Sequence, residues 1–460
     1  MLITFRVSNF LSFNSEVEFS LLKGKSRQPE SHVISFGSGR NAVEILKLGV
    51  IYGANASGKS NLLKAIEFGK LAIVNGLKNT FMPPSHFRLE EGKKDLSSKF
   101  EFEFETNGNL FAYGFDIVLD KYQVVNEWLV EMKKTTDKPV FERHVQNDGN
   151  SIYNSRPNFF GEDEKRFEIY AQDVSPNELL LNILGEKVWS EKSVFSLFHQ
   201  IYHWFEEQLF VFGPNSQFSV SEMSANDIPF FLEQLKRFKT GIVKISLEKS
   251  DKTDQIIEKL PEKIRANLLE SLGKGGTPIF SISGMRYCFS KEYDKIVVKQ
   301  VLTGHKLKGS ESIINFSLGA ESDGTQRMFD LIPLLSVLSQ GNVTVIVDEI
   351  DRSLHPEMSR NLIETMSVVS EGVASQLIMT THESSLLDLK NLLRRDEVWF
   401  VEKNTDGESK LYSLEEYKPR FDKELRKAYL QGRFGAIPFI ASPHNLGWNG
   451  TKKTTEYAEG

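Results

Sequence analysis

The stretch "IYGANASGKS", residues 51–60, decides how this chain folds. It contains Gly53 and Gly58, and Lys59 and Ser60 follow directly after the second glycine. In a loop of this pattern the glycines let consecutive backbone N–H groups surround a phosphate group, the lysine reaches the β- and γ-phosphates, and the hydroxyl binds Mg²⁺. The residues predicted to bind a nucleotide are Gly53, Asn55, Gly58, Lys59, Ser60 and Asn61.

The residues on either side of this loop support the same interpretation. Before it, "LKLGVIY" (46–52) predicts a buried strand. After it, "SNLLKAIEFGKLAIV" (60–74) predicts a helix whose N-terminus faces the phosphates. The alternative is an ordinary glycine turn between a strand and a helix. The pattern and its context together favour the phosphate loop.

A second part of the site is predicted by "VTVIVDEIDRSLHPEM", residues 343–358. Its β-branched run is typical of a central parallel strand, and Asp348 and Glu349 stand at the carboxyl end of that run. We expect Asp348 to hold Mg²⁺ through water and Glu349 to polarise the attacking water. Carboxylates also end strands without any catalytic role, so this assignment depends on the phosphate loop.

A third apolar strand, "SQLIMTTHES" (375–384), ends just before His382. A histidine at this place can contact the γ-phosphate, although a lone histidine is more often structural. The sequence therefore predicts Glu349 and His382 as catalytic residues, with Ser60 and Asp348 at the metal.

The composition sets limits on the class of protein. The chain has 460 residues, of which 40% are hydrophobic and 26% charged, so a globular protein with more than one subdomain is expected. The formal net charge of −6 argues against non-specific coating of nucleic acid. No apolar run is long enough to span a membrane. The single cysteine, Cys288, and the lack of a secretory signal predict a cytoplasmic location.

The segment "FSLGAESDGTQRMFDLIPLL" (316–335) resembles the signature motif of ABC-type ATPases of the AAA family, in the form E-S-x-G-T-x-R. "DRSLHPEM" (351–358) is similar to the D-loop of these proteins. In this class, the signature motif contacts the nucleotide held by another protomer. The resemblance therefore implies that Ser322 and Gly324 contact ATP bound to a second copy, and that the chain forms a homo-oligomer, a dimer or higher, through shared ATP sites.

The layout of the whole chain resembles the heads of SMC and RecF proteins. Lys59 and Glu349 are 290 positions apart, which implies a large insertion between two lobes. The opening "LITFRVSNFLSFNSEVEFSL" (2–21) is similar to the first strand of these heads. Two segments, "LRRDEVWFVEKNTDGESKLYSL" (393–414) and "AYLQGRFGAIPFI" (428–440), look like the ATPase subunits of prokaryotic anti-phage systems of the RloA and PARIS (AriA-like) type, which are relatives of OLD ATPases.

This resemblance implies ATP and Mg²⁺ as cofactors and a sensor or scaffold role in a toxin–antitoxin-like antiviral defence. The partners it implies are a separate toxic nuclease of the toprim type and a phage protein as the trigger. The residues after His382 contain no Asp-x-Asp pair, so the chain is not expected to carry a nuclease of its own.

Two alternatives remain open at this point. One is a RecF-like repair ATPase that binds DNA through the basic segment "KPRFDKELRKAYLQGRF" (418–434), although nucleic acid is the less favoured partner. The other is a scaffold that binds ATP and scarcely hydrolyses it. The sequence also departs from the ABC pattern, because it lacks a convincing glutamine loop. Ser85 or His86 are the residues that could replace that glutamine.

The predicted fold class is therefore α/β: an ABC-type P-loop ATPase head with a mixed sheet core, an antiparallel β lobe and a helical insertion subdomain. Apolar and polar residues alternate over 100–145, which predicts the antiparallel strands. The expected divisions are an N-terminal ATPase lobe (1–150), a helical insertion subdomain (151–305), a C-terminal ATPase lobe (306–415) and a C-terminal helix and tail (416–460).

Overall fold

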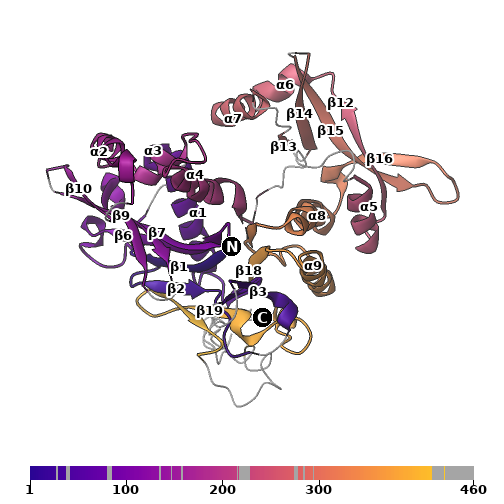
Figure 1. Ribbon diagram of the computed structural model, residues 1–460. Coiled ribbons are helices and arrows are strands. Elements are labelled where there is room, and N and C mark those ends of the chain that lie inside the picture. The colour runs from indigo at the N-terminus through magenta and orange to yellow at the C-terminus, as the bar shows by residue number, and fades with distance from the viewer. Residues whose placement is uncertain are drawn as a thin grey trace, which may run out of the picture.

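Three large β-sheets and the helices packed on them make up the computed structural model of the chain (Figure 1). The structure describes residues 1–26, 29–37, 42–79, 85–133, 136–146, 148–156, 159–214, 216, 228–273, 278–282, 285–293, 295–416 and 429. The predicted C-terminal helix and tail, with the basic segment, lie outside these residues except at Glu416 and Tyr429.

A six-stranded central sheet carries the phosphate loop. Its strands are β5 (Leu48–Gly53), β11 (Leu209–Phe212), β17 (Thr344–Val347), β18 (Gln376–Thr381), β19 (Val398–Lys403) and β20 (Ser409–Ser413). The spatial order is β11-β17-β18-β5-β19-β20, and every pair is parallel except β19 with β20. Parallel strands end at the same side of a sheet, so the residues that follow β5, β17 and β18 are brought close together.

Helices cover both faces of this central sheet, as its buried strands require. On one face, Ile51 and Ile346 join the core that also contains α1 (Lys59–Asn75) and the N-terminal strands. On the other face, Val345 and Val347 pack with α8 (Asp323–Gln340) and α9 (Pro356–Val369). The alternation of side chains along each strand explains this division.

The second sheet is the predicted antiparallel lobe. Its strands are β1 (Leu2–Ser8), β2 (Val17–Ser20), β6 (Ser98–Thr106), β7 (Asn109–Val118), β8 (Gln123–Met132), β9 (Lys138–Val145) and β10 (Ser151–Ser155), in the order β10-β9-β8-β7-β6-β1-β2. Phe100, Phe102 and Phe104 alternate along β6 and are fully buried. A short hairpin, β3 (Val33–Phe36) with β4 (Val43–Leu46), lies beside the two sheets. The predicted α/β class, a mixed central sheet with an antiparallel lobe, is confirmed.

The segment 151–305 differs from the single helical subdomain that its sequence suggested. Its first part contributes α2 (Glu164–Asp173), α3 (Leu180–Gly185), α4 (Ser196–His203) and a π-helical turn (Trp204–Gln208) to the core of the antiparallel lobe. Strand β11 then enters the central sheet. The residues after β11 build an outer subdomain, although Phe231, Leu235 and Ile242 still pack into the core that contains α8.

This outer subdomain contains a five-stranded antiparallel sheet together with its helices. The elements are α5 (Ile228–Arg237), β12 (Ile242–Lys249), α6 (Thr253–Glu258), α7 (Glu262–Gly273), β13 (Ile279–Ile282), β14 (Met285–Glu292), β15 (Lys295–Lys306) and β16 (Ile313–Ser317). Figure 1 shows this sheet apart from the other two, with α6 and α7 beside it. Apolar residues at every second position of β14 and β15 pack in its core, and this period of two is the signal that the helical interpretation overlooked.

Candidate functional site

The predicted phosphate loop joins the end of β5 to the start of α1. Gly58, which precedes the helix, has φ of 117°, a conformation that glycine adopts without strain. A Cβ atom on Gly53 would lie 2.5 Å from Ser57 Oγ and 2.7 Å from the carbonyl oxygen of Val401, so only glycine fits there. The strand, loop and helix therefore have the geometry that presents backbone N–H groups to a phosphate.

Lys59 connects the loop electrostatically to the acidic residues of the second lobe. Its side chain is buried, and Nζ donates to the carbonyl oxygens of Gly53 (2.6 Å) and Ala54 (3.0 Å). Burial lowers the pKa of Lys59, while the negative charges of Asp348 and Glu349 act in the opposite direction. The fold thus brings together groups that are far apart in the sequence.

Two serines that the sequence gave no reason to single out hold the phosphate loop in place. Ser409 Oγ donates to the carbonyl oxygen of Ser57 (2.6 Å) and lies 2.7 Å from Ser12 Oγ. Asn61, predicted to bind the nucleotide, donates its side-chain amide to Ser12 Oγ (2.8 Å). Asn55 is exposed, and Ser60 is half-buried in the first turn of α1.

The acidic pair lies on a tight turn that Thr380 of the neighbouring strand supports. Asp348 is buried, and its carboxylate accepts a hydrogen bond from Thr380 Oγ1. The same hydroxyl accepts from the backbone N–H of Glu349 (2.8 Å). Glu349 itself has φ of 48°, which is uncommon for a residue with a side chain and is typical of functional turns.

Arg327 joins the signature-like segment to this acidic turn. Its guanidinium is buried and donates to the carbonyl oxygens of Asp348 and Glu349, both at 3.2 Å. Burial lowers its pKa, and the negative charge of Asp330 opposes that effect. The arginine therefore fixes helix α8 against the turn that carries the acidic pair.

The start of α8 is exposed at the surface. Ser322 is the N-cap residue, and its hydroxyl accepts from the N–H of Thr325 (3.3 Å). Gly324 lies against the backbone of the next loop, because a Cβ atom there would be 2.8 Å from the carbonyl oxygen of Ser353. Ser322 and Asp323 are both exposed. The helix N-terminus is thus available to a group from outside the chain.

His382 follows β18, and its Nε2 lies 3.4 Å from Asp351 Oδ2 in the D-loop-like segment. Its side chain is 52% exposed. Asp351 is buried, and its negative charge also acts on the pKa of Lys59. The structure thus brings His382, the acidic turn and the phosphate loop to the same end of the central sheet.

The two residues proposed in place of a glutamine lie beside a cleft of about 480 Å³ next to the phosphate loop. His86 Nδ1 is 3.0 Å from Asp120 Oδ1, and the carbonyl oxygen of Ser85 accepts from the N–H of Leu11 (2.8 Å). The cleft is also lined by Ser12 and Asn61, which contact the loop.

Comparison with known proteins identifies the family of the chain. The model of the family described as "AAA domain, putative AbiEii toxin, Type IV TA system" matches residues 48–388, a span that contains the phosphate loop, the signature-like segment and the acidic turn. The fold and site define an AAA-type nucleotide-binding protein. The chain belongs to this AAA-domain family. None of the curated proteins matches it.

Solved structures of SMC heads are similar to the chain. One is an SMC head bound to the C-winged helix domain of ScpA (14% identity, 90% of this chain and 99% of that chain, TM-score 0.36). Another is the SMC head domain from Thermotoga maritima (14%, 90% and 98%, TM-score 0.32). A third is an SMC head domain with an extended coiled coil bound to the C-terminal domain of ScpA, from Pyrococcus furiosus (15%, 90% and 97%, TM-score 0.34).

In the part of the chain that the structure describes, no helix combines the length and the apolar character that crossing a membrane requires.

Proposed function

We propose that this chain is an ABC-type ATPase that binds ATP with Mg²⁺ and hydrolyses it to ADP and phosphate. The observation that carries the proposal is the sheet topology: the phosphate loop follows β5 and the acidic pair follows β17, two parallel strands with only β18 between them, so both lie at the same end of the central sheet. In this arrangement Lys59 and the loop amides bind the phosphates, and Glu349 orients the attacking water as general base. His382 contacts the γ-phosphate side of the site.

The residues present fit Mg²⁺. The Ser60 hydroxyl and the Asp348 carboxylate would hold the ion, directly or through water, because oxygen atoms are the ligands that Mg²⁺ prefers. Among the described residues, the buried Oδ1 of Asp351 has no hydrogen-bond partner, so the same pocket has a further oxygen free for a bound water. When bound, the ion neutralises phosphate charge during hydrolysis.

The nucleoside part of ATP has a suitable place beside the phosphate loop. The cleft of about 480 Å³ adjoins Asn61 and is lined in addition by Phe87, Arg88 and Lys403. Phe87 is buried, whereas Arg88 and Lys403 are exposed; a guanidinium can stack on a base, and both cations suit a polyphosphate chain. This cleft lies on the phosphate-loop side, where the glutamine replacements Ser85 and His86 also lie.

The ATP site is shared between two copies in this proposal. Ser322 is exposed at the N-terminus of α8, where a hydroxyl and free backbone N–H groups suit a phosphate of a second protomer. ATP would thereby join two copies, and hydrolysis would release them. This is a shift of population between associated and separate states.

Substitution of Ser322 by arginine tests this sharing. We expect Ser322→Arg to abolish ATP-dependent association in analytical ultracentrifugation, because the larger side chain occupies the space of the phosphate. Ser339→Arg is the matched control, since Ser339 is exposed at the opposite end of the same helix. Unaltered association of Ser322→Arg, with full ATPase activity, would argue that the signature-like segment is not shared.

The biological role we propose is that of a cytoplasmic sensor that holds a separate toxic nuclease of the toprim type in anti-phage defence and releases it after a phage protein is detected. Its support is the resemblance of the tail segments to defence ATPases and the family description, which names a toxin and a type IV TA system. Co-purification of the chain with the product of a neighbouring toprim gene, with and without ATP, tests this role. Salt-dependent DNA binding that stimulates ATPase activity, with no effector bound, would instead indicate the RecF-like repair function.

A further inference from the structure

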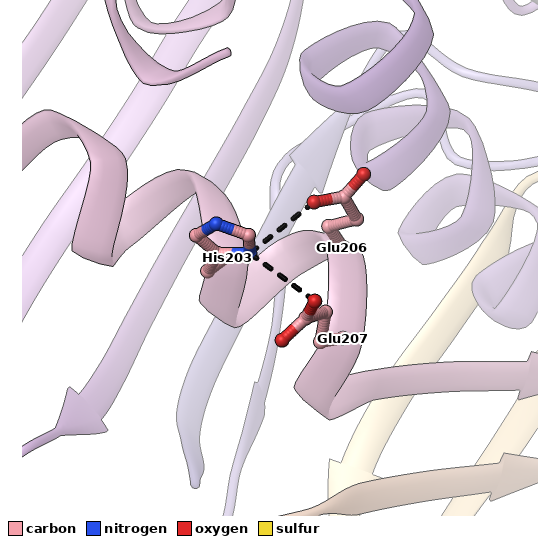
Figure 2. Close-up of side chains that lie close together, drawn as sticks. All are labelled: His203, Glu206 and Glu207. Carbon is pink, nitrogen blue, oxygen red and sulfur yellow. Dashed lines mark ion pairs between the residues drawn. The ribbon is translucent and has the colours of Figure 1, made fainter. Parts of the chain in front are cut away.

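A second cluster of chemically active side chains lies away from the nucleotide site, where α4 ends in the π-helical turn. Figure 2 shows His203, Glu206 and Glu207 directed toward one another. His203 Nδ1 lies 3.2 Å from Glu206 Oε2 and 3.5 Å from Glu207 Oε1. One ligand atom from each of the three residues falls within 4.8 Å of the others. Single turns of π-helix occur frequently at functional sites.

A chain of hydrogen bonds fixes the proton positions on the two histidines of α4. His199 Nδ1 lies 2.7 Å from the carbonyl oxygen of Gly185, and a carbonyl oxygen only accepts, so this nitrogen carries hydrogen. In a neutral ring, His199 Nε2 then accepts the hydrogen bond that joins it to His203 Nε2 at 3.0 Å. His203 Nε2 is therefore the donor. A neutral His203 presents the lone pair of Nδ1 to the two carboxylates.

Three electron-rich groups that face one another repel unless a cation lies among them. A proton on His203 Nδ1 is one such cation. However, Nδ1 is buried and has no hydrogen-bond partner among the described residues, although two carboxylate oxygens are within ion-pair distance. A proton on Nδ1 would therefore be poorly aligned with either oxygen, whereas a metal ion can be surrounded by all three ligand atoms.

We propose that His203, Glu206 and Glu207 bind a divalent transition-metal cation, with His199 as the residue that positions His203 for ligation. One imidazole nitrogen and carboxylate oxygens suit Zn²⁺ or Mn²⁺, and water completes the coordination. A ligating histidine usually donates its other ring N–H to a neighbouring acceptor, which is the relation of His203 to His199. This proposal does not depend on the proposed ATPase function.

The packing around the turn gives the bound metal a structural consequence. Trp204 and Phe205 are fully buried, and the Trp204 ring stacks on Phe104 with centroids 4.3 Å apart. The turn leads directly into β11, whose Phe212 carbonyl oxygen accepts from the N–H of Asp348 (2.8 Å). A metal at the turn would therefore stabilise the connection between the antiparallel lobe and the acidic strand of the ATP site.

The surrounding charges are compatible with a cation at this place. The nearby ammonium group of Lys70 donates to backbone carbonyl oxygens, those of Leu209 (2.5 Å) and Glu206 (3.5 Å). It therefore leaves the carboxylate oxygens of Glu206 and Glu207 available. Both carboxylates are partly exposed, so water and metal have access from solvent.

Calorimetric titration of the metal-stripped full chain with Zn²⁺, without nucleotide, tests the proposal. We expect wild type to bind one Zn²⁺ tightly and Glu207→Gln to weaken that binding at least about tenfold. The Glu207 side chain is 67% exposed, so this variant keeps its fold, which circular dichroism checks. His199→Ala should lower affinity about 10–100-fold by freeing the orientation of His203.

Two controls identify the site. His144→Gln, which replaces an exposed histidine that bonds to Asn126, should bind Zn²⁺ as wild type does. The visible absorption of Co²⁺, added in place of Zn²⁺, should change in Glu207→Gln and not in His144→Gln. Lack of Zn²⁺ binding by wild type, or equal affinity in wild type and Glu207→Gln, would overturn the proposal and leave an ion pair of protonated His203.

Discussion

The phosphate-loop half of the proposed ATP site (residues 53–60 with Asp348 and Glu349) and its signature half (residues 313–327) are held in different ways. In the first half, Lys59 and Asp348 are only 7% and 3% exposed, and hydrogen bonds from serines and a threonine fix the loop and the acidic turn. In the second half, Ser322 is exposed.

Strand β16, which leads into the signature half, exposes large apolar side chains. Ile313, Ile314 and Phe316 are each 43–44% exposed, although all three belong to a strand of the outer sheet. Exposed apolar side chains that lie together often mark a surface that binds a partner. This difference is consistent with the proposal that one half of the site is complete within the chain and that the other half meets a second molecule.

The largest effect is expected from Glu349→Gln, which removes the proposed general base from the phosphate-loop half. ATP binding should persist, and turnover should fall about 10²–10⁴-fold, because the amide cannot accept the proton of the attacking water. Phosphate release under saturating ATP measures the change. Glu364→Gln, an exposed position on α9, is the control and should retain full activity. Normal hydrolysis by Glu349→Gln would remove Glu349 from the catalytic role.

Lys59→Ala tests whether the buried loop binds phosphate. We expect ATP affinity in calorimetry to fall about 100-fold or more, since a charged donor to the phosphates is lost. Lys47→Ala is a matched control, because Lys47 is also buried and donates to a carbonyl oxygen, that of Ser370, at the opposite end of β5. This control should lose stability and keep its ATP affinity. Equal affinities of wild type and Lys59→Ala would contradict the assignment of the loop.

Thr380→Val tests whether the Thr380 hydroxyl stabilises the acidic turn. The substitution removes the hydroxyl that donates to Asp348 and accepts from the N–H of Glu349, and leaves both groups without this partner. The free energy of unfolding in urea should fall by about 1–3 kcal/mol, and turnover should fall with it. Thr365→Val, which removes a hydroxyl that bonds only within α9, should change stability less. A stable and fully active Thr380→Val would show that the acidic turn keeps its conformation without this hydroxyl.

The smallest effect is expected from replacing Lys70, which lies on α1 after the phosphate loop. Burial lowers its pKa to about 8, from the ordinary 10.5. Between these pH values the unfolded chain keeps a proton that the folded chain loses, so this group makes the free energy of unfolding rise with pH. The slope is at most about 1.4 kcal/mol per pH unit, and it should be absent in Lys70→Met. Urea unfolding of wild type and of Lys70→Met at pH 7.5 and 9.5 measures the two slopes. Equal slopes would contradict the lowered pKa of Lys70.

The sequence predicted those parts of the molecule that depend on local patterns. The phosphate loop, the strand before Asp348 and the alternating strands over 100–145 each follow from short stretches, and the structure places all of them as expected. We expected residues 151–305 to form a single helical subdomain, but the structure places them in three different parts of the fold. The first helices pack in the core of the antiparallel lobe, β11 joins the central sheet, and the period-two strands β14 and β15 form another core.

The supporting residues of the site could not be predicted in the same way. Ser12, Ser409 and Thr380 act through hydrogen bonds to residues far away in the sequence, and a lone serine or threonine carries no spacing signal. Arg327 lies in the signature-like pattern, yet its contact with the acidic turn depends on how α8 packs. The proposed metal site of His203, Glu206 and Glu207 lies where α4 ends in the π-helical turn, which the sequence did not predict.

The most direct test of the shared ATP site is the activity of mixed variants. Glu349→Gln damages the phosphate-loop half and Ser322→Ala damages the signature half, and each should be nearly inactive alone. In a mixed dimer, one site combines the two intact halves, so an equal mixture should recover about a quarter of wild-type turnover. Mixing Glu349→Gln with Lys59→Ala, both in the same half, should recover none. If the first mixture stayed as inactive as its components, the claim that two copies share each ATP would be contradicted.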